Sequence, residues 1–273
     1  MTLLDSARER SAEGAVIVPT SELGIDLDRV TVTFGRDRPV FSEVDLRIGP
    51  GEFVAIVGAS GCGKTTLMNI IAGLVRVDSG RATVAGTPPI AGRPDIAYIL
   101  ARDALLPWKT VQGNVEYALK LSGVPRRERS SRALAYLDKV GLGHATELLP
   151  AALSHGMRQR VALARAFAVE RSIYLLDEPF SALDAQTKLT LQNHLLALWE
   201  ENRKTVVFVT HDIGEAVALA DRVVVMAADG GGIIEQIPVE LPRPRSSEEL
   251  QESAEFHDVY RTTWHALRRG MGA

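Results

Sequence analysis

The sequence predicts an α/β fold built on a mainly parallel central sheet. Apolar runs of strand length alternate with segments of helical periodicity through most of the chain. One glycine-rich turn, residues 58–65, joins the strand-like run 53–57 directly to a helix that starts at Thr66. This alternation favours parallel pairing, because each helix carries the chain back to the same end of the sheet.

The N-terminal part has a different pattern, in which apolar and polar residues alternate with the period of half-buried strands. The runs 25–27 and 30–34 are predicted to form a hairpin, and a further strand covers 44–48. A turn at 78–80 leads into a short strand at 81–84. These segments predict an N-terminal antiparallel β subdomain beside the parallel sheet.

The remaining predicted strands are short apolar runs at 96–100, 173–176, 205–210 and 222–226. Apolar residues at three- and four-residue spacing predict helices at 111–121, 126–140, 157–168, 188–200 and 213–219. The first three of these helices form an inserted helical subdomain at about 103–168. We therefore expect three parts: a flexible leader over 1–22, one domain over 23–240 and a polar, helical tail over 241–273.

Composition narrows the function classes. The net charge is -3 over 273 residues, which gives no case for a nucleic-acid partner. The single cysteine, Cys62, excludes an internal disulfide and indicates a reducing compartment. Apolar runs such as 223–226 are far shorter than the about 20 residues of a membrane-spanning helix. Residues 1–22 also lack the pattern of a signal peptide, so any connection to a membrane is expected through a partner.

The glycine-rich turn matches the pattern G-x-x-x-x-G-K-T between a strand and a helix, which is the context of a nucleoside triphosphate site. Backbone N–H groups and the helix N-terminus would surround the phosphates. Lys64 would reach the β- and γ-phosphates, and the Thr65 hydroxyl would ligate Mg²⁺. We expect Cys62 to be a small residue that fits the loop rather than a redox group. The predicted nucleotide-binding residues here are Gly58, Ala59, Ser60, Gly61, Cys62, Gly63, Lys64, Thr65 and Thr66.

Two carboxylates follow the apolar run 173–176. Successive residues of a strand point to opposite sides, so Asp177 and Glu178 can divide their roles. Asp177 would support Mg²⁺ through its water shell, while Glu178 would polarise an attacking water molecule. The alternative is that both are surface charges without a site. A carboxylate pair after a buried run favours the site.

A third polar residue, His211, follows the strand predicted at 205–210. The carboxyl ends of parallel strands are where open α/β sheets bind ligands. His211 would hydrogen-bond the γ-phosphate or hold the attacking water, and the alternative is a packed or helix-capping histidine. The predicted catalytic residues are Lys64, Glu178 and His211.

Several motifs together resemble a known family. These motifs are Phe34, the loop 58–65, the run 153–160, the carboxylate pair, the run 181–184 and His211. In the order of these motifs, the chain resembles the nucleotide-binding subunit of an ATP-binding cassette (ABC) transporter. The resemblance extends from about residue 25 to 240. Residues 105–108, 157–160 and 241–245 further resemble the nitrate/sulfonate/taurine importer branch.

This resemblance implies a P-loop NTPase sandwich and a dimeric mechanism. Two subunits would enclose two ATP molecules, with ATP and Mg²⁺ as cofactors. Phe34 would stack on the adenine, and Asp184 would link the two sites. Ser154 and Gly156 would reach the γ-phosphate held by the other subunit, the serine through its hydroxyl and the following helix through its N-terminus.

The resemblance also implies partners and a location. The chain would pair with a second nucleotide-binding subunit, either itself or a paralogue, and with an integral-membrane permease. A solute-binding protein would act indirectly, and no nucleic acid would bind. The location would be cytoplasmic, peripheral on the inner face of the plasma membrane. The transported solute would be a small anion such as a sulfonate, taurine or nitrate.

Two positions depart from the family pattern. Ala101 stands where the family has a glutamine that contacts Mg²⁺ and water, seven residues before Trp108. His155 replaces a glycine of the Leu-Ser-Gly-Gly signature. If that glycine requires positive φ, His155 would be strained by about 1–2 kcal/mol. These departures motivate an alternative function: a degenerate cassette with weak hydrolysis, acting as a regulatory or asymmetric partner.

Two further interpretations remain open at this stage. A soluble cassette ATPase acting on DNA or ribosomes is a third possible function, which the mildly acidic charge disfavours. Leu105, Leu106 and Trp108 form either an exposed apolar patch that docks the permease or an internal contact that packs the helical insertion.

Overall fold

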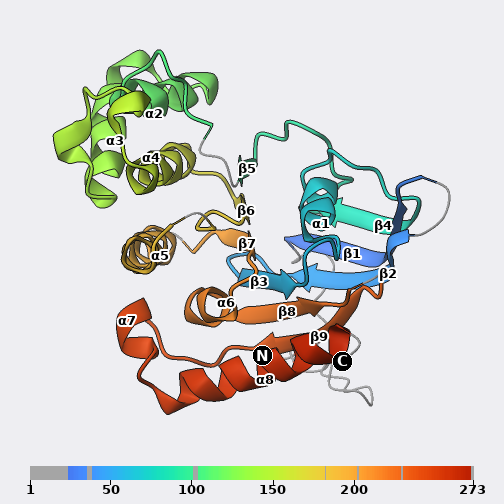
Figure 1. The fold of residues 1–273 in the computed structure, drawn as a ribbon. Coiled ribbons are helices and arrows are strands. Elements are labelled where there is room, and N and C mark those ends of the chain that lie inside the picture. Colours follow the sequence, from blue (N-terminus) through green and yellow to red (C-terminus); the bar gives the residue numbers. More distant parts are fainter. Residues whose placement is uncertain are drawn as a thin grey trace, which may run out of the picture.

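The computed structural model describes residues 24–35, 39–100, 104–181, 183–201, 203–228 and 230–271. The predicted leader, residues 1–22, and Ala101 therefore lie outside the described residues. The larger sheet has the strand order β5-β6-β7-β3-β8-β9, and the smaller sheet has the order β2-β1-β4. Figure 1 shows the larger sheet running through the middle of the molecule.

The elements have the following bounds. The strands are β1 (Ile25–Thr33), β2 (Pro39–Ile48), β3 (Phe53–Gly58), β4 (Ser79–Val84), β5 (Ile96–Ile99), β6 (Ile173–Asp177), β7 (Thr205–Val209), β8 (Arg222–Met226) and β9 (Ile233–Pro238). The α-helices are α1 (Lys64–Ile71), α2 (Val111–Leu121), α3 (Arg126–Lys139), α4 (His155–Ala168), α5 (Ala185–Glu200), α6 (Ile213–Leu219), α7 (Ser247–Leu250) and α8 (Ala254–Gly270). Short 3-10 turns cover Gly143–Ala145 and Pro150–Ala152.

The mainly parallel sheet and the antiparallel subdomain are confirmed. Strand β3 pairs in parallel with β7 and β8, and β6 pairs in parallel with β5 and β7. The edge strand β9 is antiparallel to β8. Strands β3, β6 and β7 are buried along their whole length, which is why they read as unbroken apolar runs. In the smaller sheet, β1 pairs antiparallel with β2 and β4.

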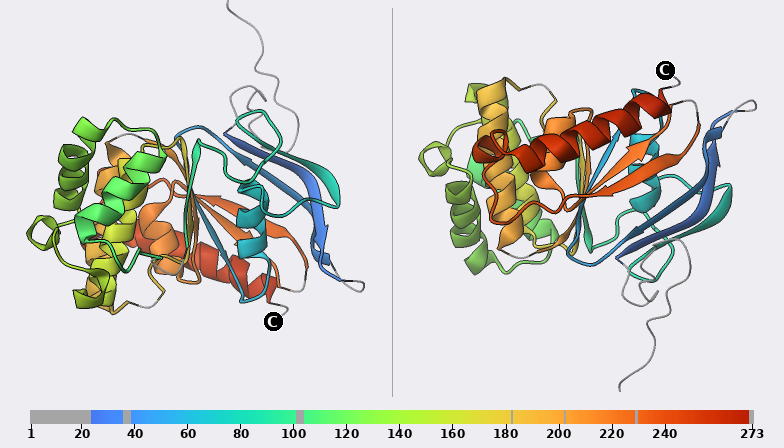
Figure 2. Two further views of the ribbon diagram at one scale, coloured as in Figure 1. Left: turned by 90° about the horizontal axis from the view of Figure 1, so that it is seen from above. Right: turned by 90° about the horizontal axis from the view of Figure 1, so that it is seen from below.

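The central sheet separates two hydrophobic cores. Alternate residues of β3 divide between them: Phe53, Ala55 and Val57 face one core, while Val54 and Ile56 face the other. The first core lies under the helices from α2 to α6, and the second lies under α1 and the smaller sheet. The result is a sandwich in which α1 lies against one face of the central sheet and the inserted helices lie beyond the other (Figure 2).

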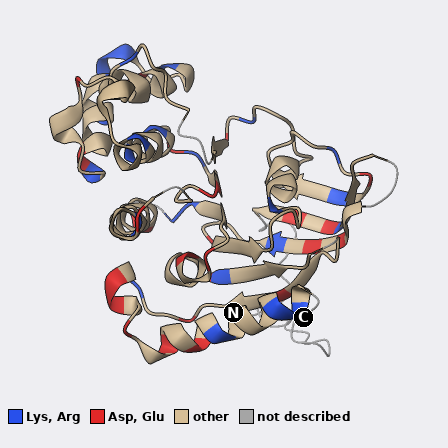
Figure 3. Cartoon of the chain, in the orientation of Figure 1, with Lys and Arg blue, Asp and Glu red and all other residues tan. Residues whose placement is uncertain are grey.

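Charges of both signs are spread over the sheets and helices of this sandwich (Figure 3). Within the described ranges, no helix is both long enough and apolar enough to cross a bilayer.

Two details of the predicted secondary structure are wrong. Residues 25–34 do not form a hairpin, because β1 is one strand whose register shifts between Asp28 and Thr31. Arg29 has a φ of 47°, and its N–H donates to Asp45 of β2 at 2.9 Å. Asp28 and Arg29, which separate the two predicted runs, are thus an irregularity inside one strand. Strand β9 is not predicted from the sequence; only one of its residues, Ile237, is buried.

The segment after residue 240 is helical over α7 and α8, and it packs against the rest of the molecule. Helix α8 runs along α6, β8 and β9 on the outside of the molecule (Figure 2), and Phe256, Thr263 and Ala266 form its buried side. Arg243 lies over the Trp199 ring, 4.3 Å from its centroid, and pairs with Asp221 at 2.8 Å. The division of the chain into leader, domain and tail stays a prediction.

Arg245 ties this segment to the sheet. It is 8% exposed, and its guanidinium donates to the carbonyls of Ala220 at 2.7 Å and Leu241 at 2.9 Å. It also donates to the carbonyls of Ala218 and Val239. Burial lowers the pKa of Arg245 to about 10, so the group remains charged near neutral pH. One side chain therefore satisfies carbonyls at the end of α6 and after β9.

Replacing Arg245 with methionine should lower the free energy of unfolding by about 2–4 kcal/mol, because buried carbonyls lose a charged donor. Urea unfolding followed by circular dichroism measures this change. The matched control is Arg261→Met, since Arg261 is exposed and pairs only with Asp258 within α8 among the described residues. Equal unfolding midpoints for the two variants would show that the hydrogen bonds of Arg245 contribute nothing to stability.

Candidate active site

Three neighbouring parallel strands, β6, β7 and β3, end at the same edge of the central sheet. Their carboxyl ends carry the carboxylate pair, His211 and the phosphate loop, in that order. Two contacts join these groups. The Thr65 hydroxyl donates to Asp177 Oδ1 at 3.4 Å, and His211 Nδ1 lies 3.4 Å from Glu178 Oε2. The structure therefore brings these groups together at the carboxyl edge of the sheet, where open α/β sheets bind ligands.

The phosphate loop turns into α1 at Gly63, the residue before the first helical position. Gly63 has a φ of 102°, and a Cβ there would lie 2.8 Å from the Phe41 ring, so only glycine fits. Lys64 is 6% exposed, and its ammonium donates to the Gly58 carbonyl at 2.8 Å and the Ala59 carbonyl at 3.0 Å. The loop and the start of α1 thus place one positive charge and a helix N-terminus together, an arrangement that binds phosphate.

Cys62 is a packed residue of this loop. It is 2% exposed, and a Cβ at Gly58 would lie 2.6 Å from its sulfur. Burial raises the pKa of the Cys62 thiol, while the nearby Lys64 charge acts in the opposite direction. A thiol with a raised pKa is a poor nucleophile at neutral pH, which favours the packing interpretation over a redox role.

Asp177 and Thr65 offer oxygen ligands at the end of β6. Burial raises the pKa of Asp177, the Thr65 hydrogen bond lowers it, and the neighbouring Glu178 charge raises it again. A bound cation would favour the ionised form of such a carboxylate. No cluster of three or more His, Cys, Asp or Glu side chains suited to a metal occurs in the described part of the chain. This donor set fits Mg²⁺, which commonly uses one or two protein oxygens and completes its shell with phosphate and water.

Glu178 has an unusual backbone conformation. Its φ is 47°, and its N–H donates to the Val209 carbonyl of β7 at 2.9 Å. Positive φ costs a non-glycine residue about 1–2 kcal/mol, and such strain is concentrated at functional sites. This conformation turns the Glu178 side chain, which is 33% exposed, toward the more exposed His211 ring.

Ser154 caps the helix that follows the signature run. Its hydroxyl accepts a hydrogen bond from the Met157 N–H at 3.2 Å, so α4 begins at His155, two residues before the predicted start. Gly156 is closely packed, because a Cβ there would lie 2.5 Å from Thr187 Cγ2. His155 is not one of the residues with positive φ in the described part of the chain, so the predicted strain at this substitution does not arise.

Four predicted residues stay apart from the phosphate loop within one chain. In the part of the chain that the structure describes, no hydrogen bond or ion pair joins Phe34, Ser154, Gly156 or Asp184 to residues 58–66. Phe34 is 60% exposed just after β1, and Asp184 caps α5 by accepting from the Thr187 N–H at 3.0 Å. We expect Ser154 and Gly156 to act at a nucleotide held by a second chain, whereas stacking of Phe34 on an adenine requires no contact with the loop.

Two buried polar groups, one in the inserted helices and one behind the sheet edge, are not predicted from the sequence. Asn114 of α2 is fully buried, accepts from the Leu106 N–H at 2.7 Å and donates to the carbonyls of Lys109 and Thr110. Glu215 of α6 is 4% exposed and accepts from the Thr210 hydroxyl at 2.6 Å. The signal that could have found both is a polar residue on the apolar face of a predicted helix.

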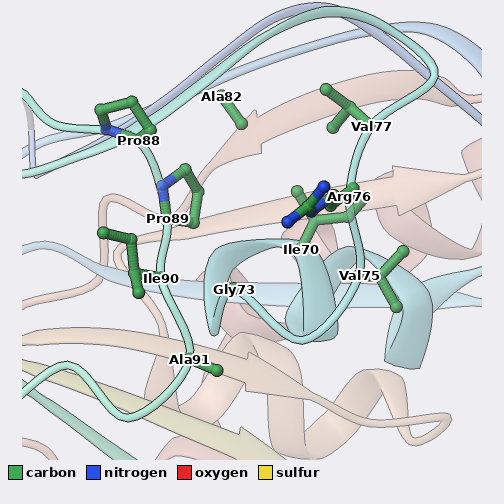
Figure 4. Close-up of a pocket in the computed structure, with 10 residues that line it drawn as sticks. All are labelled: Ile70, Gly73, Val75, Arg76, Val77, Ala82, Pro88, Pro89, Ile90 and Ala91. Atoms are coloured by element: carbon green, nitrogen blue, oxygen red, sulfur yellow. The ribbon is translucent and has the colours of Figure 1, made fainter.

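A separate hollow of about 560 Å³ lies at the opposite end of α1 (Figure 4). Its walls come from the end of α1, the segment leading into β4, and the loop at 88–91. They are mostly apolar, including Ile70, Val77, Pro89 and Ile90, with Arg76 extending between them. None of the predicted site residues lines it.

Comparison with known proteins gives a consistent picture. Residues 41–181, just over half of the chain, match the family described as ABC transporter. An ATP-binding protein of Brucella abortus is 47% identical over 224 residues, covering 82% of this chain and 86% of that protein. The bicarbonate transport ATP-binding protein CmpC of Synechococcus elongatus is 41% identical over 232 residues, covering 82% of this chain and 34% of that protein. Among solved structures, a dimeric ATP-binding cassette in a post-hydrolysis state bound to ADP and Pi has a TM-score of 0.69 and 33% identity, covering 80% of this chain and all of that chain.

The strained backbone at Glu178 leads to a stability prediction. Asparagine tolerates positive φ better than glutamate, so Glu178→Asn should raise the free energy of unfolding by about 0.5–1 kcal/mol. The matched control is Glu43→Asn, since Glu43 has a φ of 49° on an exposed part of β2. Both variants should gain stability in thermal unfolding, and a fall in the midpoint for Glu178→Asn alone would contradict the assignment of strain.

Proposed function

The chain belongs to the ABC transporter family as one of its ATP-hydrolysing subunits, and we propose that it powers an importer for a small anionic solute such as a sulfonate, taurine or nitrate. The observation that carries the hydrolytic role is the pairing of Thr65 with Asp177 and of Glu178 with His211 at one sheet edge. The importer and the class of solute are supported by the similarity of residues 105–108 and 241–245 to the nitrate/sulfonate/taurine branch. A relative named for bicarbonate transport also supports an anionic solute.

Each group at the sheet edge has a proposed task in ATP hydrolysis. Residues 58–66 bind the phosphates through backbone N–H groups, and Lys64 reaches the β- and γ-phosphates. Thr65 would ligate Mg²⁺ and Asp177 would support it through its water shell; the bound ion would neutralise charge on the phosphate oxygens. Glu178 accepts a hydrogen bond from the attacking water, and His211 orients the water or the γ-phosphate. The products are ADP and phosphate.

A second nucleotide-binding subunit completes the proposed site. Ser154, Gly156 and Asp184 make no hydrogen bond or ion pair with the phosphate loop of their own chain among the described residues. In the proposed dimer, Phe34 stacks on adenine, and Ser154 and Gly156 approach the γ-phosphate bound to the other subunit at the N-terminus of α4. Asp184 links the two sites. The dimeric cassette among the similar structures supports this arrangement, in which the partner is a second copy or a paralogue.

The proposed permease contact centres on Trp108. Its side chain is 74% exposed, whereas Leu105 and Leu106 are partly buried and Leu105 packs on the larger core. Both interpretations of this segment thus have support, the leucines as packing residues and the tryptophan as the docking residue. Asn114 bonds backbone groups of Leu106, Lys109 and Thr110, so the backbone on both sides of Trp108 is held in place. Through this contact the subunit would lie on the cytoplasmic face of the plasma membrane, with a solute-binding protein as an indirect partner.

The alternative function is a degenerate cassette that hydrolyses ATP weakly and serves as a regulatory or asymmetric partner. The observation that favours it is Ala101, which offers neither an amide nor a carbonyl side-chain group to Mg²⁺ or water. His155 adds a bulky, titratable ring at the proposed dimer surface.

Glu178→Gln should reduce Mg²⁺-dependent ATP turnover by at least about 100-fold, because the amide accepts no proton from water. ATP binding, measured by calorimetry, should persist. The double variant Ala101→Gln/His155→Gly serves as the comparison. Turnover that Glu178→Gln leaves unchanged would contradict the hydrolytic assignment, and turnover found only in the double variant would establish the degenerate cassette.

Trp108→Ala should leave the ATP turnover of the isolated subunit unchanged, since the side chain is 74% exposed and has no proposed role in hydrolysis. It should weaken association with the permease, measured by co-purification from membranes. Leu105→Ala is the control for packing and should lower the unfolding midpoint instead. Loss of folding in Trp108→Ala would show that the tryptophan packs the insertion.

A further inference from the structure

A buried ion pair, Lys188–Glu215, lies next to the turn that contains His211. Glu215 Oε1 lies 3.1 Å from Lys188 Nζ, and the side chains are only 5% and 19% exposed. The other carboxylate oxygen of Glu215 accepts from the Thr210 hydroxyl at 2.6 Å. Burying a carboxylate is costly unless it is paired, so Lys188 offsets the cost of placing Glu215 in the core.

This pair fixes the turn that contains His211. The Thr210 hydroxyl, held by Glu215, accepts from the Asp212 N–H at 3.0 Å. Asp212 caps α6 by accepting from the Gly214 N–H at 2.8 Å, and its second oxygen lies 3.7 Å from Lys188. The residues on both sides of His211 are therefore held by one network, whereas the ring itself is largely exposed.

The same lysine lies in the first turn of α5. Its N–H donates to the Asp184 carbonyl at 3.0 Å, and the residue before it, Thr187, bonds the Asp184 carboxylate through both its N–H and its hydroxyl. Thr187 also packs against Gly156, since a Cβ at that glycine would lie 2.5 Å from Thr187 Cγ2. The first turn of α5 therefore contacts α4 at Gly156 on one side and, through Lys188, the turn that contains His211 on the other.

We propose that Lys188 and Glu215 are positioning residues that keep the His211 turn in a fixed position relative to the first turn of α5. In the proposed function, His211 acts on the nucleotide of its own subunit, while Asp184 and Gly156 face the nucleotide of the other. The inference rests on that function and deepens it: the Lys188–Glu215 pair is the connection within one subunit between the two ATP sites. Neither residue touches the nucleotide.

The test compares steady-state ATP hydrolysis in the full-length protein and in Lys188 variants. Lys188→Met should lower kcat by about tenfold and change the KM for Mg·ATP by less than about twofold, because misplacing a group slows chemistry without weakening the phosphate loop. Lys188→Arg should restore most of kcat. Since both residues act as one pair, Lys188→Met/Glu215→Gln should lose no more than the worse single variant.

The matched control is Lys139→Met. Lys139 ends α3 and pairs with Glu201, the residue that follows α5, so the substitution removes an ion pair at the opposite end of α5 without touching the His211 turn. Its kcat should equal that of the unmodified protein. A kcat for Lys188→Met within twofold of that value would overturn the proposal. A parallel rise in KM and fall in thermal midpoint without rescue by arginine would also overturn it, because a merely structural role predicts that pattern.

A second measurement separates this inference from the proposed function. The ring resonances of His211, assigned by comparison with His211→Gln, should shift in Lys188→Met and stay unchanged in Lys139→Met. This NMR result does not depend on turnover. If the unmodified protein fails to hydrolyse ATP, the proposed function fails while a resonance shift still supports the connection. Unshifted resonances in Lys188→Met would overturn the connection even in an active enzyme.

Discussion

Parallel pairing of β6, β7 and β3 is the constraint on which the site depends. Parallel strands in adjacent positions must end at one edge, and the residues that follow them are then neighbours although they are far apart in sequence. Burial on both faces makes the strands rigid and leaves only their ends free to carry polar groups. The contacts between Thr65 and Asp177 and between Glu178 and His211 are consequences of this arrangement.

The parts of the fold that could be predicted are those encoded by local pattern. Helix α2 and the buried strands were placed within a residue or two, because their apolar spacing leaves few alternatives. The hairpin expected at 25–34 is wrong, since Asp28 and Arg29 look like a turn unless it is known that Asp45 of the neighbouring strand accepts from the Arg29 N–H. Strand β9 was missed for a related reason: its formation depends on pairing with β8 rather than on its own sequence.

The candidate site divides in the same way. Motif residues such as Lys64 and Asp177 could be named in advance because each directly follows a local pattern, Lys64 a strand and glycine-rich loop and Asp177 a buried apolar run. The Lys188–Glu215 pair could not, because its members come from two helices whose contact is set by packing over the sheet. The strain at Glu178 was equally invisible, since sequence carries no information on a φ of 47° imposed by a bond to β7. The roles of Phe34 and Ser154 stay predictions, because they depend on a bound nucleotide and, for Ser154, on a second chain.

Arg243 and Arg245 hold the segment after residue 240 on the main body, and this attachment has an evolutionary consequence. Arg245 holds the end of α6, and α6 begins two residues after His211, so the tail braces the back of the helix that carries the catalytic turn. Recombination that exchanges the tail between relatives would alter the support of the active site as well as the outer surface. The tail and α6 should therefore be inherited together, and swapped tails should be accepted only where both arginines and their carbonyl partners are matched.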